Sequence, residues 1–437
     1  MKKHGCKWLL FLLSGMLLLS SCQDVTYPDT DTTEEVDTQD TVDTNSHKYA
    51  YYQRRLAYED GYLYFMSTNN TAALPATGVV GSLMRYNIKT GNVTYVCPDP
   101  LCMHGTIECP FAGHFSHFAV IDRKILYRKR IRLSTANPRV DPPQNLIQYC
   151  MFDTKKMEYS VLLEHPVDGQ TTNFFRLLYH KDMWYTTDWN ISAETGETVK
   201  NIRQLNTKTG EAVLVNNEDF SYNNMLFILN DRIYFSDPAS IFSTDLNLRD
   251  KTVHAEDRFA SGMFETNGES VFYGETVSQT LPDESKVIFS NLYSYHLQTG
   301  EKTDLEIQTN PDHWFITDKY IYYMPVEPSG VKGAGSPFNC SGVWRCHHDG
   351  TGKEKVFDLY RYEEGAELPG IIFQLWDPVV VDNVMYSLFG MWEDLNGNGI
   401  REKGEGDSYS TSKNPEDFRL LKMDLTTNTY EIIYPMR

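Results

Sequence analysis

Hydrophobic and polar residues alternate with a period of two along most of this chain, in paired runs joined by short polar turns. Residues 291–307, NLYSYHLQTGEKTDLEI, are one such pair, with a turn on Gln-Thr-Gly between two alternating runs. Alternation of period two is typical of β-strands, and a short glycine-containing turn between two such runs predicts a β-hairpin. Other copies of the hairpin turn on Lys-Thr-Gly or Asp-Gly.

The hairpin is the second half of a longer unit, because another pair of aromatic-rich strands precedes each copy. We count seven such units. Their leading strands lie near residues 56–66, 118–127, 175–184, 226–235, 263–273, 314–323 and 379–388. Their closing hairpins lie near residues 83–96, 148–163, 202–215, 241–253, 292–307, 343–357 and 420–433.

A four-stranded unit cannot bury both faces of its sheet alone, whereas radial repetition places every sheet between two others. The sequence therefore predicts an all-β fold, a single β-propeller of about seven four-stranded blades over residues 47–437. Six or eight blades also fit, because the fourth unit is short and the last is long. An open β-solenoid or two β-sandwiches are the competing interpretations, but a repeat of roughly fifty-five residues is close to the length of kelch-like blades.

Three units resemble a known family of propellers. Residues 233–242, 185–189 and 343–352 are similar to the Tyr-Trp-Thr-Asp repeat and its following hairpin in low-density-lipoprotein-receptor-related proteins, although the central Trp of the motif is absent. The whole chain more nearly resembles bacterial lipoproteins that carry the propeller domain of unknown function 5050. That resemblance implies a propeller displayed outside the cytoplasm, and it implies no reaction.

Residues 1–21 have a basic start, an apolar core and small residues before Cys22, which is typical of a secretory signal peptide. The sequence Leu-Ser-Ser-Cys at 19–22 matches the bacterial lipobox, so we expect Cys22 to be acylated, for example with palmitate. An ordinary signal peptide with an incidental cysteine is the alternative. The expected location is the extracytoplasmic face of the cell membrane, held by lipid alone.

Residues 22–46 carry the lipidated cysteine and then an Asp/Thr-rich stretch with no Lys or Arg. Such a segment cannot bury enough apolar surface to offset its ordering entropy, so we expect a disordered tether. The whole chain has a formal net charge of −19. This charge argues against nucleic acid as a partner, because phosphates would be repelled.

A cysteine insert lies between the first and second units. Cys97, Cys102, His104 and Cys109 follow a Cys-x4-Cys-x-His-x4-Cys pattern, and three Cys and one His could hold Zn²⁺ tetrahedrally. Disulfides and free thiols are the other interpretations; an exported protein favours disulfides, and six cysteines remain after the leader and Cys22. Cys340 and Cys346 form a second candidate disulfide.

An acidic loop near the C-terminus predicts a structural calcium site. Its oxygen ligands follow the spacing of the twelve-residue calcium loop, with side chains at positions one, three, five, nine and twelve and a backbone carbonyl at seven. The ligands are Asp394, Asn396, Asn398, Ile400, Glu402 and Glu405. Arg401 replaces the usual hydrophobic residue, which indicates a loop between strands instead of an EF-hand. An unliganded acidic turn is the alternative.

Motifs for a nucleophile elbow, a zinc-protease helix, a phosphate loop or a dinucleotide site do not occur. We therefore favour a non-enzymatic binding or interaction module for a protein, peptide or glycan. A surface glycan hydrolase or lyase with an active site in the channel is the alternative, because propeller enzymes of that kind use carboxylates dispersed over several blades. Converging carboxylate pairs would favour the enzyme, and an apolar patch would favour a protein partner.

Overall fold

The computed structural model describes an all-β chain over residues 55–68, 81–99, 101–102, 109–111, 118–132, 144–168, 177–191, 198–215, 224–237, 239–256, 263–280, 286–326, 342–362, 370–394 and 420–434. These residues belong to one compact unit, Asp43–Arg437. They form 28 strands in six antiparallel sheets. The predicted leader and tether, residues 1–46, lie outside the described residues.

The first four blades are separate four-stranded sheets, each built from consecutive strands. Blade 1 contains β1 (Leu56–Glu59), β2 (Tyr62–Thr68), β3 (Gly81–Asn87) and β4 (Val93–Tyr95). Blade 2 contains β5 (Phe118–Ile121), β6 (Lys124–Arg132), β7 (Gln144–Asp153) and β8 (Glu158–Asp168). Blade 3 contains β9 (Leu177–His180), β10 (Met183–Ile191), β11 (Thr198–Asn206) and β12 (Ala212–Val215). Blade 4 contains β13 (Asn224–Leu229), β14 (Arg232–Asp237), β15 (Ser240–Asp245) and β16 (Thr252–Glu256).

Blades 5 and 6 share one seven-stranded sheet. Blade 5 contains β17 (Phe264–Thr266), β18 (Ser270–Thr280), β19 (Lys286–His296) and the first part of β20 (Lys302–Ile316). Blade 6 uses the last part of β20 with β21 (Tyr320–Pro325), β22 (Gly342–His347) and β23 (Glu354–Asp358). Blade 7 contains β25 (Gly370–Val381), β26 (Val384–Asp394), β27 (Leu420–Asp424) and β28 (Thr429–Tyr434), with the short β24 (Tyr360–Tyr362) paired to β25. The described strands thus form seven blades, as the repeats predict.

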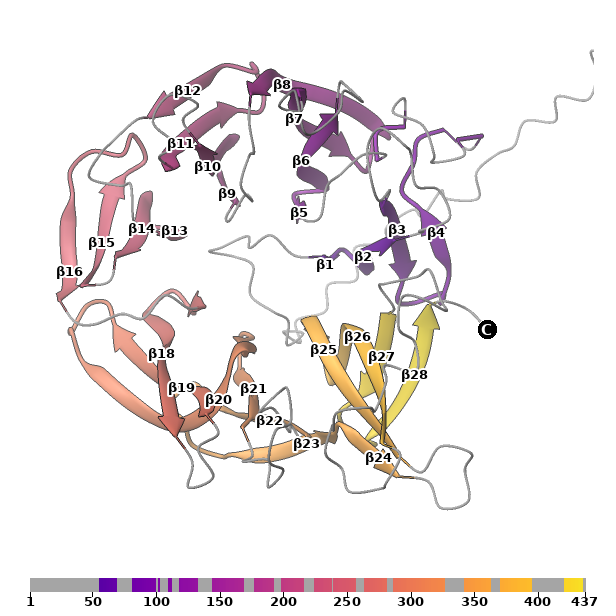
Figure 1. Ribbon diagram of the computed structural model, residues 1–437, viewed down its shortest axis with the longest axis vertical. Coiled ribbons are helices and arrows are strands. Elements are labelled where there is room, and N and C mark those ends of the chain that lie inside the picture. The colour runs from indigo at the N-terminus through magenta and orange to yellow at the C-terminus, as the bar shows by residue number, and fades with distance from the viewer. Residues whose placement is uncertain are drawn as a thin grey trace, which may run out of the picture. The chain divides into compact units, whose positions relative to one another are not determined.

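The blades surround a common centre, and the first strand of each blade lies innermost (Figure 1). The first strands of neighbouring blades contact each other, as β1 does with β5 and with β25, and β13 does with β9 and with β17. Below, the strands of a blade are called A to D from the centre outward. The prediction of an all-β propeller is confirmed.

Six clusters of buried hydrophobic side chains join the blades in sequence. They lie between blades 1 and 2, between blades 2 and 3, across blades 3, 4 and 5, between blades 5 and 6, between blades 6 and 7, and between blades 7 and 1. Each cluster buries residues from the facing sides of neighbouring sheets, which explains why alternate positions of every blade carry Tyr, Phe, Leu or Ile. The core is therefore a set of interfaces between sheets.

The ring closes between blade 7 and blade 1 by side-chain packing. In the described part of the chain, blade 1 takes all its strands from the N-terminal end and blade 7 takes all its strands from the C-terminal end. Tyr86 of β3 lies 6.1 Å from Tyr386 of β26, measured between ring centroids. The backbone N–H of Arg55 donates to Oδ2 of Asp377 at 3.2 Å. Hydrophobic contact thus takes the place of a strand shared between first and last blades.

Candidate functional site

One face of the ring carries tight turns. Strands A and B are joined by two residues in blades 1 to 4, and most of these residues have positive φ, such as Asp122 at 49° and Arg123 at 61°. Pairs of this kind are typical of type I′ hairpin turns. The turns between strands C and D lie on the same face, because the residue after strand C bonds to the A–B turn, as when Thr207 N donates to Asp182 O at 2.8 Å.

The C–D turns are held by side chains that accept backbone N–H bonds. In blade 1, Oδ1 of Asn87 accepts bonds from the N–H groups of Lys89 and Thr90 at 2.9 and 3.0 Å. A side chain accepts in the same way in the other six blades; the acceptors are Asp153, Asn206, Asp245, His296, Asp349 and Asp424. Four of these turns contain a glycine with a positive φ, as at Gly300 with 72°. The predicted turns on Lys-Thr-Gly, Gln-Thr-Gly and Asp-Gly are confirmed.

The long connections begin and end at the opposite face, because neighbouring strands alternate in direction. Strands B and C are connected by residues 69–80, 133–143, 192–197, 281–285, 326–341 and 395–419 in blades 1, 2, 3, 5, 6 and 7. Between strand D of one blade and strand A of the next it has residues 96–117, 169–176, 216–223, 257–263 and 359–369. Two connections at this face are not long. Strands B and C of blade 4 are joined by residues 238–239 alone, and β20 continues from blade 5 into blade 6 without a break. We call this side the loop face and the other side the turn face.

The sites predicted from the sequence fall on connections that begin and end at the loop face. The cysteine insert belongs to the connection from β4 to β5, and Asp394 is the last residue of β26, where the connection to β27 starts. Cys340 belongs to the connection from β21 to β22. The described strands that flank these three segments therefore end on one side of the ring.

Three of the four predicted residues of the cysteine insert come together. The Sγ atoms of Cys97, Cys102 and Cys109 all lie within 4.8 Å of one another. Cys109 is buried, and Cys97 and Cys102 are half-buried. His104, the fourth residue of the predicted group, lies outside the described residues. None of these three described cysteines forms a disulfide.

Burial affects the pKa of two thiols of the insert. It raises the pKa of Cys97, and it raises the pKa of Cys109 to about 12. Each sulfur also receives a backbone N–H bond, from Asp99 to Cys97 and from Phe111 to Cys109, and these bonds act in the opposite direction on the pKa. The group therefore consists of one buried and two half-buried thiols, and backbone N–H groups bond to two of them.

The cysteine group lies in the interface between blades 1 and 2. Cys109 and Phe111 belong to the buried cluster of that interface, and the ring of Phe111 stacks on Tyr127 of β6 with centroids 5.5 Å apart. The hydroxyl of Tyr127 donates to the carbonyl of Pro110 at 2.8 Å. Lys129, also of β6 and only 2% exposed, donates from Nζ to the carbonyl of Cys109 at 3.1 Å.

Lys129 was not predicted from the sequence as a site residue, although its place in the alternating pattern of β6 is unusual for a lysine. Ile125, Tyr127 and Lys129 stand at alternate positions of β6, so they share one face of the strand, and all three are buried. A lysine at an apolar position of an alternating strand is unusual, because buried ammonium groups need compensation. Only the packing of the insert shows what this lysine contacts.

The remaining predicted sites are described in part or lie outside the described residues. Asp394 is placed in a strand, but Asn396, Asn398, Ile400, Glu402 and Glu405 lie outside the described residues, as does Cys22. Cys346 is a fully buried free thiol in β22, and burial raises its pKa to about 11. Its predicted partner Cys340 lies outside the described residues. The calcium, lipid and Cys340–Cys346 predictions therefore stay predictions.

The turn face is held together by polar contacts between neighbouring blades. Nε of Arg123 pairs with Oδ2 of Asp60 at 2.8 Å, and the backbone N–H of Arg123 donates to both carboxylate oxygens of Glu59 at 3.0 Å. Burial raises the pKa of Glu59 to about 7, helped by Asp60 and Asp122 and opposed by the N–H of Arg123. Between blades 3 and 4, Nζ of Lys181 pairs with Asp231 at 2.7 Å.

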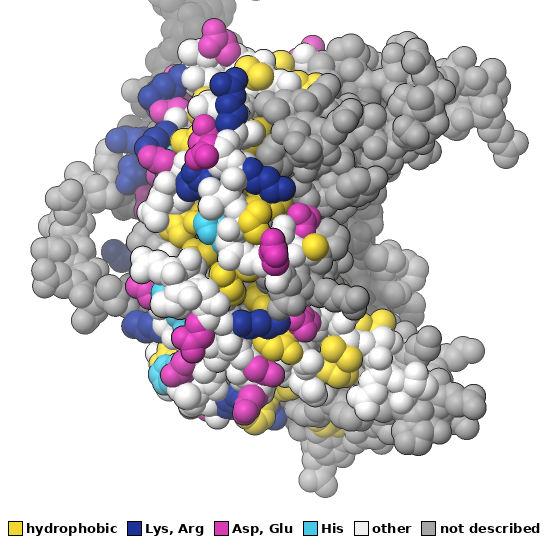
Figure 2. Space-filling model, turned by 90° about the vertical axis from the view of Figure 1, so that its left-hand side faces the viewer, with side chains coloured by type: hydrophobic (Ala, Val, Ile, Leu, Met, Phe, Trp, Pro, Cys, Tyr) yellow, Lys and Arg dark blue, Asp and Glu magenta, His cyan; other side chains and the backbone are white. Residues whose placement is uncertain are grey.

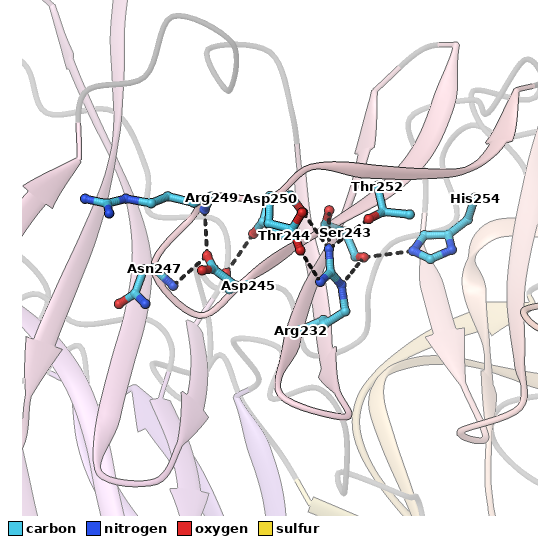
Figure 3. Close-up of polar contacts among 9 residues, drawn as sticks. All are labelled: Arg232, Ser243, Thr244, Asp245, Asn247, Arg249, Asp250, Thr252 and His254. Carbon is cyan, nitrogen blue, oxygen red and sulfur yellow. Dashed lines mark hydrogen bonds and ion pairs between the residues drawn. The ribbon is translucent and has the colours of Figure 1, made fainter.

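Blade 4 contains a polar network that could be mistaken for a catalytic group (Figure 3). Oγ of Ser243 lies 2.8 Å from Nε2 of His254, and Nε of Arg232 donates to the same Oγ at 2.8 Å. Arg232 also bonds to Asp250 and Thr252 in the neighbouring strand and turn. Ser243 is 0% exposed, so a substrate cannot reach its hydroxyl. The network binds strands B, C and D together.

The exposed apolar side chains of the outermost strands do not gather in one place. Among the described residues they are spread over five blades; they are Tyr95, Val161, Val213, Leu214, Val253 and Tyr430. Figure 2 shows one side of the surface, where hydrophobic side chains occur in small groups among acidic and basic ones. The described outer strands therefore offer dispersed apolar positions.

A search of the described residues for a helix long and apolar enough to span a membrane finds none. No protein-family model matches the chain. No curated protein matches its sequence either. The resemblances to receptor-related propellers and to the domain of unknown function 5050 therefore stay predictions.

Several solved structures resemble the fold. The chain is similar to the β-propeller domain of the trilobed protease from Pyrococcus furiosus, with 11% identity over 89% of this chain and 100% of that domain at a TM-score of 0.49. It is also similar to the Pyrococcus horikoshii acylaminoacyl peptidase, with 10% identity, 80% and 53% coverage and a TM-score of 0.45. BamB from Moraxella catarrhalis matches with 12% identity, 73% and 82% coverage and a TM-score of 0.33. The chain spans about half (53%) of the peptidases' length, and at these identities the likeness concerns the fold alone.

Proposed function

We propose that this protein is a non-enzymatic binding or interaction module whose ligand, a protein, peptide or glycan, docks on the loop face. The observation that supports it is the contrast between the two faces. The turn face is closed by tight turns and by contacts such as Asp60 with Arg123. Most of the long connections begin and end at the loop face, and loops on a rigid scaffold usually carry binding residues.

The absence of a usable nucleophile at the described Ser–His contact fits this proposal. Ser243 and His254 lie within hydrogen-bond distance, but both serve a buried structural network with Arg232. A propeller fold by itself is compatible with many functions. The support for a binding role is therefore the face at which the long connections begin and end. Its test must include a measurement of released product, which an enzyme would form.

The proposed cellular location is the extracytoplasmic face of the cell membrane, where a lipid on Cys22 anchors the chain. The acidic tether over residues 23–46 separates the propeller from the membrane, because like charges extend such a chain. Mass spectrometry of the N-terminal peptide from the native membrane fraction tests this arrangement. A diacylated or triacylated peptide that begins at Cys22 supports it, and an unmodified peptide that begins elsewhere refutes it.

We also propose that Ca²⁺ orders the connection that starts at Asp394. The six predicted ligands supply the hard oxygen atoms that Ca²⁺ prefers, and the expected affinity is weak, with a Kd on the order of 10⁻⁴ to 10⁻³ M. The ion would have a structural role on the loop face, next to strands β26 and β27.

The proposed function is tested by incubating the immobilised full chain with cell-wall, polysaccharide and surface-protein fractions in the presence of Ca²⁺. Both retained material and released product are recorded. Retention without new product supports a binding module. Release of shortened saccharides or peptides overturns the non-enzymatic role and directs the search to carboxylates of the channel.

A further inference from the structure

Three sulfur atoms converge where the connection after blade 1 meets blade 2. Cys97 follows β4 by two residues, Cys102 lies in the next turn, and Cys109 lies in the buried interface with blade 2. Their Sγ atoms lie within 4.8 Å of one another. Three thiolates around a tetrahedral Zn²⁺ sit roughly 3.8 Å apart, given a Zn–S distance of ~2.3 Å. The observed spacing therefore allows all three sulfurs to contact one ion after small shifts.

Backbone N–H groups bond to two of the three sulfurs. The N–H groups of Asp99 and Phe111 bond to the sulfurs of Cys97 and Cys109, in each case from two residues further along the chain. The carbonyl of Asp99 accepts a bond from Cys102 N at 3.1 Å, which turns the chain back toward Cys97. Hydrogen bonds to a charged sulfur stabilise the thiolate relative to the thiol.

A buried cation lies beside the group. Nζ of Lys129 donates to the carbonyl of Cys109 at 3.1 Å, and Lys129 is only 2% exposed. A divalent ion with three thiolates carries a net charge of −1, and burying that charge requires a compensating positive group nearby. Lys129 stands where such compensation is needed.

We propose that Cys97, Cys102 and Cys109 bind one Zn²⁺ ion and so fasten the connection between blades 1 and 2 to their interface, with Lys129 as the counter-cation. Binding forms three Zn–S bonds and releases three thiol protons to solvent, with no change in oxidation state. A disulfide would join only two of the three sulfurs, would leave the third unpaired, and would need an oxidant. The proposal extends beyond ligand binding, because it concerns how the loop face is built.

The first test uses the wild-type full chain, purified without chelators. We expect about one Zn²⁺ per chain by elemental analysis, and tetrahedral thiolate absorption bands after exchange of Zn²⁺ for Co²⁺. Alkylation and peptide mapping then identify the state of each cysteine. A disulfide between any two of the three, or three free thiols that take up neither Zn²⁺ nor Co²⁺ at stoichiometric concentration, overturns the proposal.

The second test uses matched variants. Cys109→Ser is expected to lower the bound Zn²⁺ at least tenfold and to remove most of the Co²⁺ thiolate absorption. Cys150→Ser is the control, because Cys150 is an equally buried thiol of the same interface whose sulfur contacts the hydroxyl of Tyr159 at 3.3 Å. Retention of metal by Cys109→Ser, or its loss from a folded Cys150→Ser, overturns the assignment. Lys129→Met is expected to lower Zn²⁺ affinity more than tenfold with the same Co²⁺ spectrum, and unchanged affinity would refute the counter-cation role.

Discussion

Phe65 of blade 1 packs edge-on against Tyr434 of blade 7, with ring centroids 5.5 Å apart. The two residues come from the first and last blades, so this contact is part of the closure of the ring. Phe65 is 0% exposed and belongs to the cluster that joins these blades. Because no described strand is exchanged between them, the closure depends on such side chains.

We predict that Phe65→Ala lowers the free energy of unfolding by about 3–5 kcal/mol, since it leaves a cavity in the closing interface. Chemical denaturation followed by tryptophan fluorescence measures the loss. Tyr95→Ala, at a 47% exposed position of β4, is the control and should change stability by less than about 1 kcal/mol. Equal, small losses for both variants would mean that the packing between blades 1 and 7 does not hold the ring.

Glu59 should make the stability of the protein depend on pH. Burial raises its pKa in the folded state from 4.5 to about 7, so between these values the folded state binds the proton more tightly than the unfolded state. Stability therefore falls as the pH rises from about 4.5 to about 7 and then levels off. We predict that the melting temperature of the wild type, relative to Glu59→Gln, increases when the pH is lowered from 8 to 5.

The control for Glu59 is Glu301→Gln, which changes an exposed glutamate in the C–D turn of blade 5. This variant measures how the exchange of an exposed carboxylate changes the melting temperature at each pH. If the melting-temperature difference between Glu59→Gln and the wild type does not change with pH, folding does not shift the pKa of Glu59.

Arg232 should contribute to stability and not to chemistry. Its guanidinium bonds to Ser243, Asp250 and Thr252 and joins three strands of blade 4. Arg232→Ala leaves the buried oxygens of Ser243 without this donor, so we expect a loss on the order of 2–3 kcal/mol in the free energy of unfolding. Arg249→Ala is the control, because Arg249 contacts Asp245 through its backbone N–H. Thermal denaturation that does not distinguish these two variants would contradict the role assigned to the network.

Calcium should stabilise the loop face through the segment that begins at Asp394. We predict that millimolar Ca²⁺ raises the melting temperature of the wild type and that EDTA reverses the rise, because binding to the folded state alone adds stability. Asp394→Ala should abolish the response, while Asp318→Ala, at an exposed position in the A–B turn of blade 6, should keep it. A response that survives in Asp394→Ala would place the calcium elsewhere.

The repeats in the sequence predicted the blades because local patterns determine hairpins. Asn87, Asn206 and Asp424 each precede a turn and accept its backbone N–H bonds, so the same residues that mark the turn in the sequence also hold it. The closure through Phe65 and Tyr434 could not be predicted, because these residues are far apart in the chain and no spacing relates them.

The candidate site, like the fold, was predicted from the sequence only in part. The close spacing of Cys97, Cys102 and Cys109 predicted that they could meet, and their sulfurs do. Lys129 was missed because its contact with Cys109 depends on how the insert packs against β6. The raised pKa of Glu59 was also invisible in the sequence, since it arises from burial and from Asp60 and Asp122 at the junction of two blades.

If ligands bind at the loop face, blocking that face should reduce binding, and blocking the turn face should not. A bulky polymer is attached through a bio-orthogonal side chain at position 101, where Leu101 is 86% exposed in the connection from β4 to β5, or at position 157, where Met157 is 38% exposed in a C–D turn. Equilibrium retention of the cell-surface fraction that the unmodified chain binds is then measured. We predict that the polymer at position 101 reduces retention at least tenfold and that the polymer at position 157 leaves it unchanged. The reverse result would place the binding surface on the turn face.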